Sequence, residues 1–420
     1  MSGAGVSPTF RIRVAAAAAI ALGLLAGAPA RAELVFAVQP TLSVGYTDNA
    51  GATVDAAGTS TRQGDGLAIL SSTERLLYKG ATAEHELGYR LAITRYFNGR
   101  GVDSTSHEVA AVSLFHLSAV LDLRLSATAS LSRTSGVITA VGPTSVPQES
   151  VPGSSQYVGL TGGEEVTFAP TPRWRLVQSL QGSSVNYINL PVDPPTRTSV
   201  TALGRLELPR GRDTPLVELQ ATDFVLTGGP PGQVPPTPDQ NVFLVVAGGW
   251  RRELNPVWTG ELRAGLATMI RSAGSTLYVP DAMAQIGYRR LTWYATLTAG
   301  QHPMPNLFSG QATVNDSVTA NLTLPIGRAE QLVFTGAGGY VYARTADLAG
   351  GDLRHAYDQW TLLGLLSYRF LHAPLFVSIS YSLVEQTGTT DLLRQVVMLS
   401  LTGDFMWGKG TPPLFGGGGL

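Results

Sequence analysis

The chain has 420 residues, a formal net charge of −1 and no cysteine, and only 14% of its residues are charged. A chain of this length can form two or three soluble domains or one large barrel. The near-zero net charge argues against electrostatic binding to nucleic acid, and the missing cysteines exclude disulfides and thiolate metal sites. The charged fraction also lies well below the roughly 25% that is usual in soluble proteins.

Residues 1–32 have the three parts of a secretory signal peptide. Arg11 and Arg13 supply the positive start, Val14–Ala28 is an uncharged run of apolar and small residues, and Ala30–Ala32 matches an A-x-A cleavage site. The run is shorter than the about 20 apolar residues that a spanning helix needs. We therefore predict cleavage directly after this site and export through the Sec pathway.

The closing segment, Arg394–Trp407, shows the pattern that predicts the fold. One face is apolar and ends in aromatic residues, and it carries Val397, Leu399, Leu401, Gly403, Phe405 and Trp407. A period of two predicts a strand with a lipid-facing wall, and such a strand satisfies its backbone only when neighbours pair on both sides. We therefore expect this segment to pair with the first mature strand, Leu34–Thr47, and to close a barrel.

The same alternation predicts about 18 strands of roughly 10 to 14 residues, long enough to cross a bilayer at a tilt. They cover Leu34–Thr47, Leu67–Tyr78, Glu86–Phe97, Glu108–Leu117, Val120–Ser132, Tyr157–Phe168, Arg173–Tyr187, Val200–Leu208, Leu216–Leu226, Val242–Arg252, Val257–Arg271, Asp281–Arg290, Trp293–Gly300, Val314–Leu324, Gln331–Tyr342, Gln359–Phe370, Leu375–Glu385 and Arg394–Trp407.

The connections between these strands decide the topology. Long polar loops alternate with short turns, as in outer-membrane barrels, whose short turns face the periplasm. We predict an all-β fold: a transmembrane antiparallel up-and-down β-barrel over residues 33–407, followed by a flexible periplasmic tail, 408–420. A soluble all-β sandwich or propeller is the alternative.

The polar faces of the predicted strands carry charges of both signs. The pore-lining candidates are Arg90, Asp122, Arg124, Arg205, Glu207, Glu261, Arg263, Arg289 and Arg369, and the same faces carry Glu86, Glu165, Arg173, Arg175 and Glu218. Two interpretations stay open: the charges pair across strands and stabilise the wall, or they form a mildly cationic filter for anionic solutes. A barrel of this width holds an aqueous channel unless it is plugged, and the long loop Thr134–Gln156 is the candidate to fold inward.

No catalytic or metal-binding site is predicted. The sequence has no Walker A motif, dinucleotide fingerprint or HExxH motif, and its six histidines do not cluster with acidic residues at metal-ligand spacing. His355 and His302 are expected in outer loops, where barrel hydrolases place reactive groups, although solvated loop residues are far commoner. We therefore expect no enzyme activity and no cofactor.

The end of the first strand, Val44–Asn49, together with the signal peptide and the strand count, carries a family resemblance. The chain resembles the outer-membrane β-barrel proteins of exopolysaccharide export systems, notably those of myxobacteria; the matching motif is Tyr46–Asn49, and the rest is architecture. The resemblance implies a barrel in outer-membrane lipid that conducts a secreted polysaccharide with the help of a periplasmic polysaccharide export protein. A general or substrate-selective diffusion porin is the alternative, and a barrel enzyme or adhesin is a further one.

Overall fold

The computed structural model describes residues 33–50, 63–133, 156–188, 196–227, 239–271, 276–290, 292–306, 311–327, 331–346, 353–370, 373–388 and 391–408. The predicted signal peptide, the tail beyond residue 408 and all but the last residue of the predicted inward loop lie outside the described residues. The described part of the chain contains no helix that is long and apolar enough to cross a membrane.

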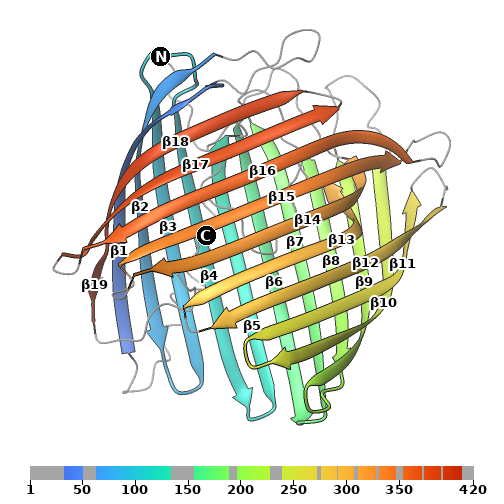
Figure 1. Cartoon of the computed structure of the whole chain (residues 1–420). Coiled ribbons are helices and arrows are strands. Elements are labelled where there is room, and N and C mark those ends of the chain that lie inside the picture. Colours follow the sequence, from blue (N-terminus) through green and yellow to red (C-terminus); the bar gives the residue numbers. More distant parts are fainter. Residues whose placement is uncertain are drawn as a thin grey trace.

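The described residues form one antiparallel sheet that closes on itself (Figure 1). Its strands are β1 (Glu33–Thr47), β2 (Asp65–Lys79), β3 (Ala83–Tyr96), β4 (Ser104–Ser118), β5 (Leu121–Arg133), β6 (Gln156–Thr171), β7 (Trp174–Ile188), β8 (Thr196–Glu207), β9 (Asp213–Thr227), β10 (Asp239–Asn255), β11 (Trp258–Arg271), β12 (Thr276–Arg290), β13 (Trp293–Asn306), β14 (Gln311–Ile326), β15 (Leu332–Ala346), β16 (Leu353–Arg369), β17 (Leu375–Gly388), β18 (Leu392–Gly403) and β19 (Phe405–Trp407). Each strand pairs with its neighbours in sequence, and β1 pairs with both β2 and β18. The predicted all-β antiparallel barrel is confirmed.

The seam between β1 and β18 closes the barrel. Thr41 faces Thr402 with hydroxyl oxygens 2.9 Å apart, and Ser43 faces Ser400 at 2.7 Å. Leu42, between them, pairs with Leu401 on the other face of the sheet. The seam is therefore two-sided, with hydroxyl pairs on one face and apolar pairs on the other.

A single proline interrupts this seam without changing its register. Strands β18 and β19 pair with β1 in one continuous register, and the break between them falls at Asp404. Pro40 of β1 has no N–H to donate, so the ladder weakens here. Gln39 Nε2 donates instead to Asp404 Oδ1 at 3.0 Å, and the Asp404 N–H donates to the carbonyl of Pro374. Strands β18 and β19 together act as one strand of the wall, so the described barrel has 18 wall strands.

The two faces of the wall differ in exposure. Val246 and Leu219 are 58% and 56% exposed, whereas the next residues along their strands, Ala247 and Glu218, are 2% and 1% exposed. Because successive side chains of a strand point to opposite faces, exposed apolar residues define the outer face and their neighbours the inner face. The outer surface is therefore a broad apolar band.

Several strands extend further toward the long loops than the alternation predicted. Strand β8 begins at Thr196, β12 at Thr276 and β16 at Leu353, and β13 continues to Asn306. Backbone pairing continues there although the apolar–polar alternation fades, because the ladder needs backbone partners and not apolar side chains.

Strands β12 and β13 separate in their long-loop halves. Their last pair is Ala282 with Gln301, although β12 begins at Thr276 and β13 ends at Asn306. The same register, continued by two residues, would place Pro280 opposite Pro303. Neither proline has an N–H, so no ladder hydrogen bond can be donated by either residue. The wall divides at this point, which the sequence analysis did not anticipate.

The freed end of β13 stays paired with β14, and we call Gln301–Asn306 with Gln311–Asn315 the inner hairpin. Thr313, Val314 and Asn315 are 0%, 0% and 3% exposed. Successive residues of a strand point to opposite faces, so protein covers both faces of β14 here. A wall strand with one face toward the outside would not show this burial.

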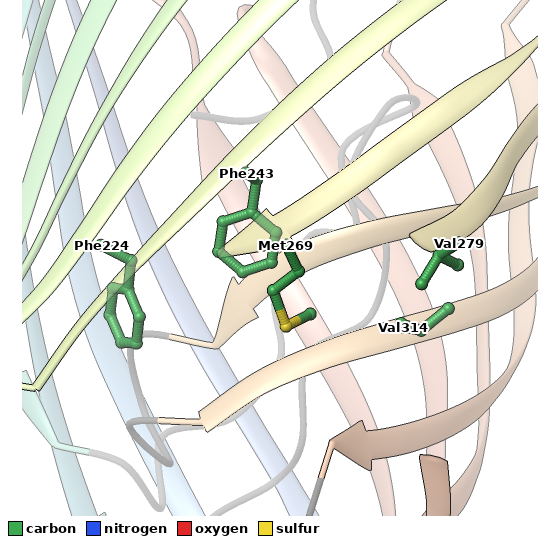
Figure 2. Close-up of a cluster of buried hydrophobic side chains, with 5 residues drawn as sticks. All are labelled: Phe224, Phe243, Met269, Val279 and Val314. Carbon is green, nitrogen blue, oxygen red and sulfur yellow. The ribbon is translucent and has the colours of Figure 1, made fainter. Parts of the chain in front are cut away.

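Figure 2 shows what Val314 packs against. It belongs to a cluster with Phe224, Phe243, Met269 and Val279, which all lie on the inner face of β9–β12 and are at most 2% exposed. The alternation of β14 puts Val314 on the outer face of its own strand. The outer face of the inner hairpin therefore lies against the inner face of β11 and β12, inside the barrel.

Barrel closure predicts a specific cross-link in this cysteine-free chain. The double substitution Ser43→Cys with Ser400→Cys should form an intramolecular disulfide on oxidation, because the two side chains face each other across β1 and β18. Non-reducing electrophoresis and peptide mass mapping measure the link. Ser43→Cys with Ser130→Cys on β5 is the matched control. Equal cross-linking in both proteins would contradict closure at this seam.

Candidate functional site

The inner wall carries a chain of ion pairs centred on Glu218 of β9. The Glu218 side chain is fully buried, and its Oε2 accepts hydrogen bonds from Arg205 Nε at 2.8 Å and Nη2 at 2.5 Å. Arg263 of β11 donates to Oε1 and also lies 3.3 Å from Asp281 Oδ2. His302 Nδ1 of the inner hairpin lies 2.5 Å from Asp281 Oδ1. The chain thus runs without a break from β8 to β13.

A second branch is centred on Arg251 of β10, and it joins the first chain where Arg205 Nη1 lies 3.9 Å from Glu207 Oε1. Arg251 Nε donates to Glu261 Oε2 at 2.7 Å, and its Nη1 lies 3.5 Å from Glu207 Oε1. Arg175 of β7 reaches the same Glu207 at 3.8 Å. Together the two branches hold four arginines and four carboxylates: Arg175, Arg205, Arg251, Arg263, Glu207, Glu218, Glu261 and Asp281. These charges cancel, so for these residues the geometry favours stabilisation of the wall over a cationic filter.

The part of the lumen beside this chain, on β4–β7, is more open. A cavity of about 280 Å³ is lined by Val112, Leu114, Asp122, Arg124, Glu165, Thr167 and Arg175. It lies close to the short turns that join β4 to β5 and β6 to β7. Arg124 is opposite Glu165 in the register, and among the described residues it forms no ion pair within 4.0 Å. Guanidinium and carboxylate groups here face open space, where they can hydrogen-bond a polar solute.

A row of hydroxyl groups lies above this cavity, farther from the short turns. Thr128, Thr161, Ser183 and Ser199 follow one another as register partners across β5, β6, β7 and β8. All four share the inner face with Arg124 and Arg175. Each lies an even number of residues along its strand from one of these arginines or from the register partner of one, Glu165 or Glu207. Ser199 is only 6% exposed, so Thr128, Thr161 and Ser183 are the members of this row that offer donors and acceptors to a passing solute.

The registers place all of the predicted pore-lining residues on the inner face. Arg90 of β3 lies between Thr73 and Glu108, Arg289 of β12 lies opposite Tyr294, and the Arg369 guanidinium lies 5.6 Å from the ring centroid of Phe376. Arg205, Glu207, Glu261 and Arg263 come together in the ion-pair chain, and Asp122 and Arg124 in the cavity. Their part in conduction stays a prediction.

Some members of the site were not predicted from the sequence, and two histidines were predicted in the wrong place. Arg251 and Asp281 were not among the pore-lining candidates, although Asp281 is eight residues from the candidate Arg289 on one predicted strand, and Arg251 follows Trp250, an aromatic residue of the outer face. The expectation that His302 and His355 occupy outer loops is wrong: they lie in β13 and β16. His355 Nε2 lies 3.0 Å from Asp358, and its ring stacks on Tyr342. Within the described residues, no group of acidic residues and histidines could hold a metal ion.

Comparison with known proteins finds similarities to solved structures only. No protein-family model matches it, and no curated protein matches it. It is similar to the siderophore receptor PirA from Pseudomonas aeruginosa, with a TM-score of 0.47, 9% identity, and coverage of 89% of this chain and 80% of the receptor. It is also similar to OpdK from the same organism, solved with vanillate, with a TM-score of 0.44, 10% identity, and coverage of 90% and 99%.

A third similar structure is the FrpB iron transporter from Neisseria meningitidis, with a TM-score of 0.47, 10% identity, and coverage of 92% of this chain and 83% of the transporter. At these identities and TM-scores the similarities carry no argument about a substrate. The closed, even-stranded antiparallel barrel with an apolar outer band is itself the architecture of outer-membrane β-barrels.

The ion-pair chain predicts a strong dependence of stability on Glu218. Glu218→Ala leaves Arg205 and Arg263 without this carboxylate and should lower the free energy of unfolding by about 3 to 5 kcal/mol. Glu165→Ala is the control, because Glu165 has no such pairs, and it should cost less than about 1 kcal/mol. Urea unfolding in detergent micelles, followed by tryptophan fluorescence, measures both. Equal losses would contradict a central role for Glu218.

Proposed function

We propose that the protein is an outer-membrane channel. The first support is the outer surface, whose apolar band is bordered near the short turns by aromatic side chains. Trp258 and Trp293, at the starts of β11 and β13, are 38% and 47% exposed, and Phe36 stacks on Trp407 with ring centroids 5.8 Å apart. Amphipathic rings at this level mark the interface between hydrocarbon and headgroups.

The second support is the inner surface, which provides the observation that carries the proposal. Beside a charge-paired wall on β8–β13 lie accessible hydroxyl groups on β5–β7 and a cavity near the short turns, where Arg124 has no ion pair among the described residues. A path of hydroxyls, guanidinium and carboxylate groups suits a solute that both donates and accepts hydrogen bonds, such as a sugar. The proposed cargo class is therefore polyhydroxylated.

Export of a secreted exopolysaccharide is our specific proposal. It combines this polar path with the resemblance carried by Tyr46–Asn49, which implies a periplasmic polysaccharide export protein as the partner. The short-turn rim faces the periplasm in outer-membrane barrels. The cavity with Arg124, Glu165 and Arg175 would then be the first part of the lumen that an exported polymer meets.

A diffusion porin is the second candidate, and one observation favours it. The inner hairpin occupies the lumenal side of β11 and β12, so this part of the lumen is narrower than the wall alone would make it. A narrow polar lumen suits a small solute at least as well as a polymer.

Deletion of the gene should separate the two candidates. If the channel exports polysaccharide, the deletion strain should keep synthesising it and retain it in the periplasm, because its route across the outer membrane is lost. Polysaccharide assays on periplasmic and culture-medium fractions measure the distribution, and the restored gene is the control. Normal secretion combined with slower uptake of a small sugar would reverse the order in favour of the porin.

Conduction should depend on the arginines of the cavity. The purified protein should conduct ions in planar bilayers, and Arg124→Gln with Arg175→Gln should shift its reversal potential toward cation preference, since two positive charges leave the lumen. The shift should shrink as salt rises, because the charges are then screened. Arg290→Gln, on the outer face beside Arg289, is the control. An equal shift in the control would contradict this path.

A further inference from the structure

We propose that the inner hairpin is a gate of the channel, held closed against the inner wall by side-chain contacts alone. The proposal rests on the proposed channel function and adds a moving part to it. Its starting observation is the division of the wall between β12 and β13, with the freed hairpin packed on the lumenal side (Figures 1 and 2).

The backbone of β12 does not hold the hairpin. Pairing between β12 and β13 covers Ala282–Arg290 and Trp293–Gln301, and no pair beyond these residues joins the two strands. The register that would continue it places Pro280 opposite Pro303, so neither of these residues can donate a ladder hydrogen bond if the hairpin moves outward. Neither the inward nor the outward position of the hairpin gains the two hydrogen bonds that these prolines cannot donate. The free-energy difference between the two positions therefore lies in side-chain contacts.

Two contacts hold the hairpin inward. The first is apolar: Val314 is fully buried against the lumenal cluster that contains Met269 and Val279 (Figure 2). The second is polar: His302 Nδ1 lies 2.5 Å from Asp281, which also pairs with Arg263 of the ion-pair chain. The His302 contact lies one residue beyond the last backbone pair, at the base of the hairpin. It suits a pivot, whereas the Val314 contact is farther along the strand and holds the far end.

These contacts make a two-position element energetically reasonable. Packed side chains can exchange one set of contacts for another more readily than a continuous ladder of hydrogen bonds can, and elements without such a ladder open at a lower free-energy cost. The hairpin remains paired with β15, where Thr313 lies opposite Thr345, so it moves as the edge of a sheet and not as a loose loop. Outward movement would uncover the lumenal face of β11 and β12 and widen the path.

The first test fixes the hairpin in place. Val279→Cys with Val314→Cys should be joined by oxidation, or by a short bifunctional thiol reagent, because the two side chains belong to one buried cluster. In planar bilayers the linked protein should stay in its smaller conductance state, and reduction of the disulfide should restore transitions to a larger state. The Ser43→Cys with Ser400→Cys protein is the control, since its link at the seam should leave these transitions unchanged.

The second test loosens the hairpin without a cross-link. Val314→Ala removes part of the buried apolar contact, and the ratio of larger to smaller conductance states should rise roughly tenfold. Val318→Ala is the matched control, four residues along the same strand, where the side chain is 45% exposed on the outer face. The ratio should not change in this control.

The possible results separate the two proposals. Failure of Val279→Cys and Val314→Cys to link would overturn the inward placement, and a linked protein with unchanged conductance would overturn the gate while leaving the channel in place. A protein that forms the link but conducts in no variant would overturn the channel and, with it, the gate. Equal ratios for Val314→Ala and Val318→Ala would likewise exclude gating by this contact.

Discussion

The constraint on which the whole structure depends is the pairing of backbone N–H and C=O groups. A sheet in hydrocarbon cannot leave an edge unpaired, at a cost of several kcal/mol for each group, so the first and last strands must meet. The seam of β1 with β18 provides this closure, and its inner hydroxyl pairs, such as Ser43 with Ser400, satisfy side chains that would otherwise be polar groups without partners. The outer apolar face can then be continuous around the barrel.

Prolines remove backbone donors from the sheet at two places, the seam and the β12–β13 boundary, with different results. Pro40 removes one hydrogen-bond donor from the seam, and the register is unchanged on both sides of it. Here the Gln39 side chain donates to the Asp404 carboxylate, and the Asp404 N–H donates to the carbonyl of Pro374. Pro280 and Pro303 would face each other, so donors are missing from both strands at one level. The neighbouring His302 and Asp281 side chains are in contact across the two strands, but backbone pairing ends at Ala282 and Gln301 and the wall divides. One missing donor leaves the pairing of the seam intact, whereas at the two opposed prolines the pairing of β12 with β13 has ended.

Alternation predicted the strands and the face on which Arg205 or Glu261 lies, because the direction of a side chain within a strand follows from local parity. The alternation within one strand could not predict which side chains of other strands form ion pairs with them. Glu218 binds Arg205 and Arg263 because strands β8, β9 and β11 bring their inner faces together in one register and curvature, which is a property of the closed sheet. Val314 shows most clearly where prediction from alternation fails. Its position in the strand predicts an outward side chain, but it is buried inside the barrel because this part of β14 lies inside the wall.

The inner surface divides into two parts with different physical roles. On β8–β13 the arginines and carboxylates neutralise one another, and the same pairs that remove net charge also fix the wall and the base of the inner hairpin at His302. On β4–β7 the charges are fewer and more open, with Arg124 facing a cavity. A count of lumenal arginines therefore says little about selectivity, because a paired arginine presents almost no field to a solute. In the proposed channel, selectivity would arise where pairing is incomplete, and the width of the path would be set where the wall has folded inward.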